Sequence, residues 1–252
     1  MPRQARKRSG TGIYHVMLRG INRQVIFHDD EDCLTFINVI KKKKIKSKFD
    51  LYAYCLMGNH VHLLLREKDE SVSSIMQRIC SSFVYWYNLK YDRNGHLFQE
   101  RFKSEPVENE RYLFTVLRYI HQNPIKAGIV RRIEDYKWNS YHEYFRKNSF
   151  IDTCYILNLF SEDLTESLNK YKEFMSQEND DICLDYDEKR RLSDDDLLLL
   201  IEEKFGVKKG LFHLLDDETR RNIIRRLKSL NGVSIRQISR VTGVSKYKVE
   251  NA

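Results

Sequence analysis

The sequence predicts an α+β protein made of two folded parts. Strand-like and helical segments alternate in the order β-α-β-β-α-β-α over residues 1–150, and only helical patterns follow from Ser193 onward. An acidic tract from Ser161 to Asp187 separates these regions. We therefore expect a larger mixed domain over residues 1–150, a partly helical acidic linker over 151–190 and a smaller helical domain over 191–252.

The first strand, helix and hairpin of the mixed domain follow from residue patterning. Ile13 to Arg19 alternates and is rich in β-branched and aromatic side chains, which is typical of a strand. Asp30 to Lys46 opens with acidic residues and then places apolar side chains on one face of a helix. Two further strand-like runs, FDLYAYCLM and HVHLLLRE, flank Gly58 and Asn59. This dipeptide favours a tight turn, so we expect a β-hairpin here.

The rest of the mixed domain continues the alternation. Ser71 to Tyr91 has apolar residues at helical spacing behind a serine cap. GHLFQERFKSEPVE returns to strand character, with Pro106 marking an edge or the end of the strand. Asn109 caps a last helix that runs toward Pro124. This order is the split βαβ, ferredoxin-like arrangement, for which we expect an antiparallel sheet with its helices on one face.

The C-terminal domain is predicted to be all-α and helix-turn-helix-like. In SIRQISRVTGVSKYKVENA a helical pattern is followed by Gly243 and then by Ser245, which can cap a new helix. The basic run RRNIIRRLK precedes this segment. An accessory helical hairpin with no DNA contact is the alternative. On the first interpretation, Ser245, Lys246 and Lys248 lie near duplex DNA.

Composition favours an acidic partner and an intracellular setting. Lys and Arg number 44 against 36 Asp and Glu, a net charge of +8, and KKKKIKSK is one concentrated basic run. A phosphate backbone suits this asymmetry, although a basic run is more often a solvated helix face. The five cysteines contain no CxxC pair, which argues against a disulfide framework and a cysteine zinc site. No apolar run reaches the roughly 18 to 20 residues of a membrane span, so we expect a cytoplasmic protein without membrane contact.

His60 and His62 are the residues that packing explains least well. Side chains i and i+2 of a strand share a face, so the two imidazoles point the same way and form a candidate pair of metal ligands. Two surface histidines are the alternative, and for this pair alone we would favour it. The motif RYIHQNP places Tyr119 and Asn123 four residues apart on a helix, hence as neighbours. A tyrosine beside an amide oxygen can serve as a nucleophile beside a third ligand, whereas a core aromatic is the other interpretation of Tyr119.

The chain resembles one family of enzymes across four ordered motifs. YHVMLRGINRQVIF, YCLMGNHVHLLL, GHLFQERFKS and LRYIHQNPIKAGIV are similar in order and spacing to the REP-associated tyrosine transposases, single-tyrosine HUH endonucleases related to the single-strand insertion-sequence transposases. The resemblance covers residues 13–144. It implies a ferredoxin-like domain in which His60, His62 and Asn123 bind Mg²⁺ or Mn²⁺ and Tyr119 is the nucleophile. It also implies a monomer whose partner is single-stranded DNA with a hairpin, REP-like structure.

The implied reaction is cleavage and strand transfer of single-stranded DNA. Attack by Tyr119 on a phosphodiester leaves a 5′-phosphotyrosine and a free 3′-hydroxyl, so bond energy is kept for rejoining. Basic residues in the same motifs are candidates for holding the phosphate. These candidate DNA-binding residues are Arg19, Arg101, Lys103 and Lys126. His15 is expected to be structural or to face DNA, with a metal role as the alternative.

Two other functions fit the same residues. One is a sequence-specific DNA-binding regulator that keeps the fold without chemistry. The other is a metal-dependent nuclease in which water attacks and Tyr119 only packs. A protein–DNA adduct that resists denaturation separates the tyrosine mechanism from both alternatives.

Overall fold

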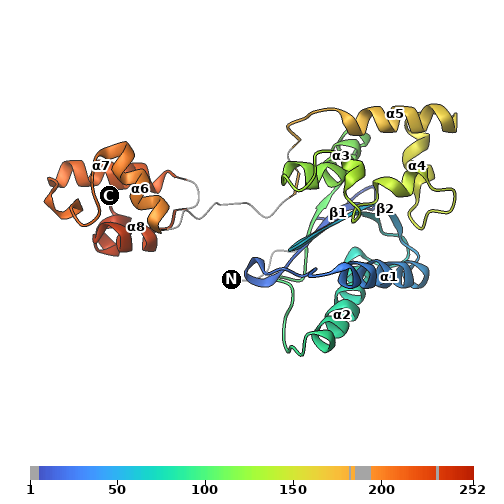
Figure 1. Ribbon diagram of the computed structural model, residues 1–252, viewed down its shortest axis with the longest axis horizontal. Coiled ribbons are helices and arrows are strands. Elements are labelled where there is room, and N and C mark those ends of the chain that lie inside the picture. Colours follow the sequence, from blue (N-terminus) through green and yellow to red (C-terminus); the bar gives the residue numbers. More distant parts are fainter. Residues whose placement is uncertain (1–5, 182, 185–193, 231–232) are drawn as a thin grey trace. The chain divides into compact units, whose positions relative to one another are not determined.

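The computed structural model describes residues 6–181, 183–184, 194–230 and 233–252, and the chain divides into two compact units after Leu184. Figure 1 shows the elements of each unit. None of the helices within the described residues is long and apolar enough to cross a membrane. All five cysteines are unpaired thiols.

A four-stranded antiparallel sheet lies at the centre of the first unit. Its strands are β1 (Ile13–Arg19), β2 (Asp50–Met57), β3 (His60–Arg66) and β4 (Lys103–Pro106), in the order β2-β3-β1-β4. This is the ferredoxin-like strand order, so the predicted fold class is confirmed. Met57 pairs with His60, which places the hairpin turn at Gly58 and Asn59 as expected.

Helices cover both faces of this sheet. α1 (Asp30–Ser47) and α2 (Val72–Lys90) lie on one face, and α3 (Glu110–Lys126) lies on the other (Figure 1). The expectation of helices on one face is therefore correct for α1 and α2 and wrong for α3. The physical reason is that the interior of β3 is buried on both sides, so each face needs a covering layer.

Side chains cap the three helices, and the caps of α2 and α3 are at the predicted positions. The carboxylate of Asp29 accepts a hydrogen bond from the N–H of Asp32 at the start of α1. Ser71 caps α2, and the side chain of Asn109 accepts from Tyr112 N–H at the start of α3. These bonds satisfy amide groups that have no partner within the helix and so fix where each helix begins.

The segment after residue 150 belongs to the first unit and is not a linker at its start. α4 (Thr153–Asn158) and α5 (Leu164–Ser176) place four side chains in the main hydrophobic core: Ile156, Leu157, Tyr171 and Met175. The ring of Tyr171 stacks on Tyr144 at 4.2 Å between centroids. The linker prediction was wrong here because it relied on the acidic composition of the tract, in which only a few residues are apolar and buried. The expected boundary at residue 190 lies outside the described residues.

The second unit is a helical bundle with its own core. Its helices are α6 (Asp194–Phe205), α7 (Asp217–Lys228), α8 (Ile235–Thr242) and α9 (Lys246–Glu250). The buried core includes Leu197, Leu227, Ile238 and Val249. Gly243 ends α8 with φ +73°, a conformation that glycine adopts without strain, and Ser245 caps α9. The predicted helix, glycine turn and capped helix are all present.

Candidate active site

β3 presents His60 and His62 on the sheet face that α3 covers. They are the first and third residues of the strand, and their ring centroids lie 5.1 Å apart with planes at 88°. His62 is fully buried, whereas His60 is partly exposed. The shared face predicted from strand periodicity is confirmed. Two surface histidines are excluded as an explanation, because one of the rings has no exposed surface.

α3 brings Tyr119 and Asn123 to these histidines. The Tyr119 ring stands edge-on to His62, with centroids 5.6 Å apart and planes at 81°. Oδ1 of Asn123 lies 3.3 Å from Nε2 of His60. Both helix residues are largely buried, at 6% and 7% exposed. A strand and a helix distant in sequence therefore assemble the four predicted side chains into one site.

His62 has one occupied ring nitrogen and one buried nitrogen without a partner. Its Nδ1 lies 3.0 Å from Nε2 of His15, and its Nε2 has no hydrogen-bond partner within the described part of the chain. Burial, with smaller contributions from the neighbouring His15 and His60, lowers the pKa of His62 well below its ordinary value. The ring is therefore neutral and retains a lone pair. An unpartnered buried nitrogen is costly to the folded state, and a divalent metal would satisfy it.

The donor set consists of two imidazoles and one amide. No three side chains of His, Cys, Asp or Glu gather at metal-binding spacing among the residues that the structure describes, so no carboxylate joins the site. Oδ1 of Asn59 lies 2.6 Å from Nδ1 of His60 and can accept its hydrogen. With the hydrogen on Nδ1, the Nε2 of His60 is an acceptor that lies 3.3 Å from Oδ1 of Asn123. Two acceptors facing each other favour a cation between them. These residues fit a weakly bound divalent ion that keeps several waters.

Arg19 and Lys103 lie on the same sheet face as the histidines. Directly opposed residues of an antiparallel pair project to the same side. Arg19 is opposite His60, while Met17 is opposite both His62 and Lys103 in its two neighbouring strands. Both cations are thus placed where a DNA phosphate at the histidines could be held.

The other two predicted cations of the first unit differ from each other. The Lys126 ammonium lies 5.2 Å from the centre of the Tyr119 ring and also donates to Oδ1 of Asn179. Arg101 is exposed and lines a pocket against α2. The structure therefore brings Lys126 to the tyrosine, whereas no described contact brings Arg101 to the site.

The rival tyrosine of α3 is held in a different hydrogen bond. The Tyr112 hydroxyl donates to Oε2 of Glu105 at 2.6 Å. Burial and this carboxylate raise the pKa of Tyr112, which opposes formation of its phenolate. A tyrosine hydroxyl held in this way is poorly suited to act as a nucleophile.

His121 and His15 are both buried but contact different residues. His121 points away from the site and bonds to Ser140 Oγ at 2.8 Å and to the Tyr171 hydroxyl at 3.2 Å. His15 is fully buried against His62 and Tyr119, which excludes direct contact with DNA. Burial lowers the pKa of each of these two rings to about 3. Alternation along β1 placed His15 on this face, but only the strand register shows that it reaches His62.

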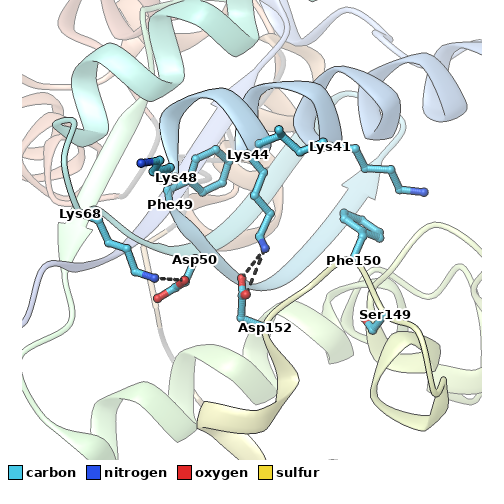
Figure 2. A pocket seen from close by; sticks show the side chains of 10 residues that line it. Lys41, Lys44, Lys48, Phe49, Asp50, Lys68, Ser149, Phe150 and Asp152 are labelled. Atoms are coloured by element: carbon cyan, nitrogen blue, oxygen red, sulfur yellow. Dashed lines mark hydrogen bonds and ion pairs between the residues drawn. The ribbon is translucent and has the colours of Figure 1, made fainter.

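The basic run at the end of α1 lines a separate pocket of about 560 Å³. Figure 2 shows Lys44 paired with Asp152 and Lys68 paired with Asp50. Lys41 lies over the ring of Phe150. The pocket shares no lining residue with the histidine site and has no histidine or cysteine in its lining, and two of its lysines are neutralised.

The three predicted DNA-binding residues of the second unit are grouped at the start of α9. The Ser245 hydroxyl accepts a hydrogen bond from the Lys248 N–H and so serves as the helix cap. Lys246 pairs with Glu250 at 3.4 Å, and both lysines are exposed. Contact of these three residues with DNA stays a prediction.

Comparison with known families identifies the fold that carries this site. Residues 10–123 match the model of the IS200-like transposases, a range that contains both histidines, Tyr119 and Asn123. This part of the chain is thus similar to the IS200-like transposases. The resemblance noted in the sequence motifs is thereby confirmed.

Two curated relatives of this chain have names that refer to REP elements. The chain is 26% identical over 137 residues to the REP-associated tyrosine transposase of Escherichia coli, covering 54% of this chain and 78% of that protein. It is 26% identical over 105 residues to a Haemophilus influenzae protein that carries the same name provisionally, covering 37% of this chain and 60% of the relative. The chain thus spans about three fifths of the Haemophilus protein.

A solved structure shares the fold. It is a REP-associated tyrosine transposase bound to a REP hairpin, which matches with a TM-score of 0.52 and 21% identity. The match covers 58% of this chain and 87% of that one. At this level of identity the comparison establishes a common architecture.

Proposed function

We propose that the chain cleaves and rejoins single-stranded DNA next to a hairpin through a covalent bond to Tyr119. The observation that carries this proposal is the position of Tyr119 edge-on to His62, whose buried Nε2 has no hydrogen-bond partner among the described residues. The REP elements named for its relatives support a hairpin substrate. Residues 10–123, which include the site, match the model of the IS200-like transposases, and this match supports the proposal.

In the proposed step Tyr119 acts as the nucleophile. Its Oη forms a bond to phosphorus, the bond from phosphorus to the 3′ oxygen breaks, and the leaving oxygen takes up a proton as the phenol loses one. The products are a 5′-phosphotyrosine and a 3′-hydroxyl, and the reverse attack rejoins the strand. The Lys126 ammonium lies 5.2 Å from the centre of the Tyr119 ring and adds positive charge beside the nucleophile.

The phosphate is held by the face of the sheet. His60, His62 and Asn123 would hold Mg²⁺ or Mn²⁺, which neutralises the non-bridging oxygens and orients the phosphodiester. Arg19 and Lys103 project from the same face and position the flanking phosphates.

The test is incubation of the full chain with a library of single-stranded DNA hairpins and Mn²⁺, followed by denaturing electrophoresis. We expect an adduct that survives denaturation, and sequencing of the trapped DNA identifies the cleavage site. Cleavage without an adduct would favour attack by water. Binding without cleavage would favour the regulator.

The second unit is predicted to strengthen hairpin binding without taking part in cleavage. Removal of residues 188–252 should weaken binding and reduce its salt dependence, because phosphate contacts release counterions. Cleavage at saturating DNA should persist, since the truncated chain keeps the core and the site of the first unit.

Binding isotherms at several salt concentrations measure this effect. A full chain carrying Lys246→Ala and Lys248→Ala is the matched variant, and we expect it to share part of the loss. Equal affinity of truncated and full-length protein at every salt concentration would show that the second unit does not bind the hairpin.

A further inference from the structure

The buried pair of His15 and His62 requires a physical explanation beyond packing. His15 comes from β1 and has no exposed surface, and the one described hydrogen bond of its ring runs from Nε2 to Nδ1 of His62 at 3.0 Å. The ring centroids are 5.2 Å apart and the planes are tilted by 30°. Burying two imidazoles side by side costs free energy unless their nitrogens form hydrogen bonds or bind a metal.

The hydrogen bond decides which nitrogen of His62 can bind a metal. A neutral imidazole carries one hydrogen and one lone pair, on different nitrogens. If Nδ1–H of His62 donates to His15, the lone pair resides on Nε2, the nitrogen that lacks a partner within the described chain. If His15 donated instead, the hydrogen would be on Nε2 of His62 and ligation there would be blocked.

We propose that His15 is a positioning residue that accepts the Nδ1 hydrogen of His62 and thereby directs the Nε2 lone pair to the metal. This inference rests on the proposed metal site. His15 also packs against Tyr119, with ring centroids 6.0 Å apart at 67°, so it fixes the ligand ring beside the nucleophile. Partners of this kind commonly hold ligating histidines in one tautomer and orientation, and their loss lowers metal affinity.

The test compares two substitutions in the full chain. His15→Leu fills the space but removes the acceptor, so Mn²⁺ affinity should fall roughly 10- to 100-fold. His15→Gln places an amide oxygen near the position of Nε2 and should restore much of the affinity. His121→Leu is the matched control, because it also removes a buried histidine but leaves the site intact. Calorimetric titration with Mn²⁺, without DNA, measures all three.

A spectroscopic measurement makes the test independent of how the variants fold. Long-range proton–nitrogen correlation of the wild-type imidazoles reports the tautomer, and we expect hydrogen on Nδ1 of His62. Hydrogen on Nε2, or Mn²⁺ affinity unchanged in folded His15→Leu, would overturn this inference alone. A wild type that binds no Mn²⁺ would overturn the proposed metal site and this inference with it.

Discussion

Tyr119→Phe is expected to abolish DNA cleavage and the covalent adduct together. The substitution keeps the ring that packs against His62 and removes only the oxygen that would bond to phosphorus. Loss of a nucleophile costs roughly 10³-fold or more in rate. The chain should fold normally, and Mn²⁺ binding and hairpin affinity should change little. Denaturing gels with a cognate hairpin measure cleavage and adduct in one experiment.

Tyr112→Phe is the matched control for this prediction. It removes a hydroxyl from the same helix, but one that donates to Glu105 and is not aimed at the histidines by any described contact. We expect this variant to cleave DNA and form the adduct as the wild type does. If Tyr119→Phe still cleaved while Tyr112→Phe did not, the nucleophile would have been assigned to the wrong residue.

His62→Ala is expected to remove most of the divalent metal affinity. The substitution deletes the buried Nε2 that we assign as a ligand, so the loss should exceed the roughly 10- to 100-fold that removal of a supporting partner costs. Cleavage should fall with metal binding, and higher Mn²⁺ concentration should restore part of it. Titration with Mn²⁺ followed by cleavage assays across metal concentration measures both effects.

The control for His62→Ala must separate metal binding from stability. His121→Ala also truncates a fully buried histidine, and it breaks bonds to Ser140 and Tyr171. It should lower the free energy of unfolding by a few kcal/mol, about 2–5 by analogy with other large-to-small core changes, and leave Mn²⁺ affinity unchanged. Equal metal affinity of His62→Ala and the wild type would contradict the ligand assignment.

Local sequence signals predicted which side chains of the site share a face, because these signals correspond to fixed geometry, whereas the roles of ligand and nucleophile came from the family resemblance and stay predictions. Strand periodicity placed His60 and His62 on one face, and helix periodicity placed Tyr119 beside Asn123. Composition and turn residues similarly located the hairpin. None of these signals says which face of the sheet a helix will cover, so α3 was expected on the wrong side.

Features that depend on strand register and long-range packing could not be predicted. The bond between His15 and His62 requires that β1 and β3 pair in one register, which alternation alone does not specify. The acidic tract after residue 150 conceals a few apolar side chains, among them Tyr171, that pack into the core of the first unit. Arg101 lies in one of the four motifs that resemble the family, but it lines a pocket against α2.

Mapping the covalent adduct to a single peptide tests the central proposal most directly. Trypsin cuts after Arg111, Arg118 and Lys126, so Tyr112 and Tyr119 fall in separate peptides, YLFTVLR and YIHQNPIK. The wild type is incubated with a cleavable hairpin and Mn²⁺, the DNA is digested to its last nucleotide, and the peptides are analysed by mass spectrometry. We predict that the nucleotide mass lies on Tyr119 in YIHQNPIK. Modification of YLFTVLR, or cleavage that leaves both peptides unmodified, would contradict the proposed mechanism.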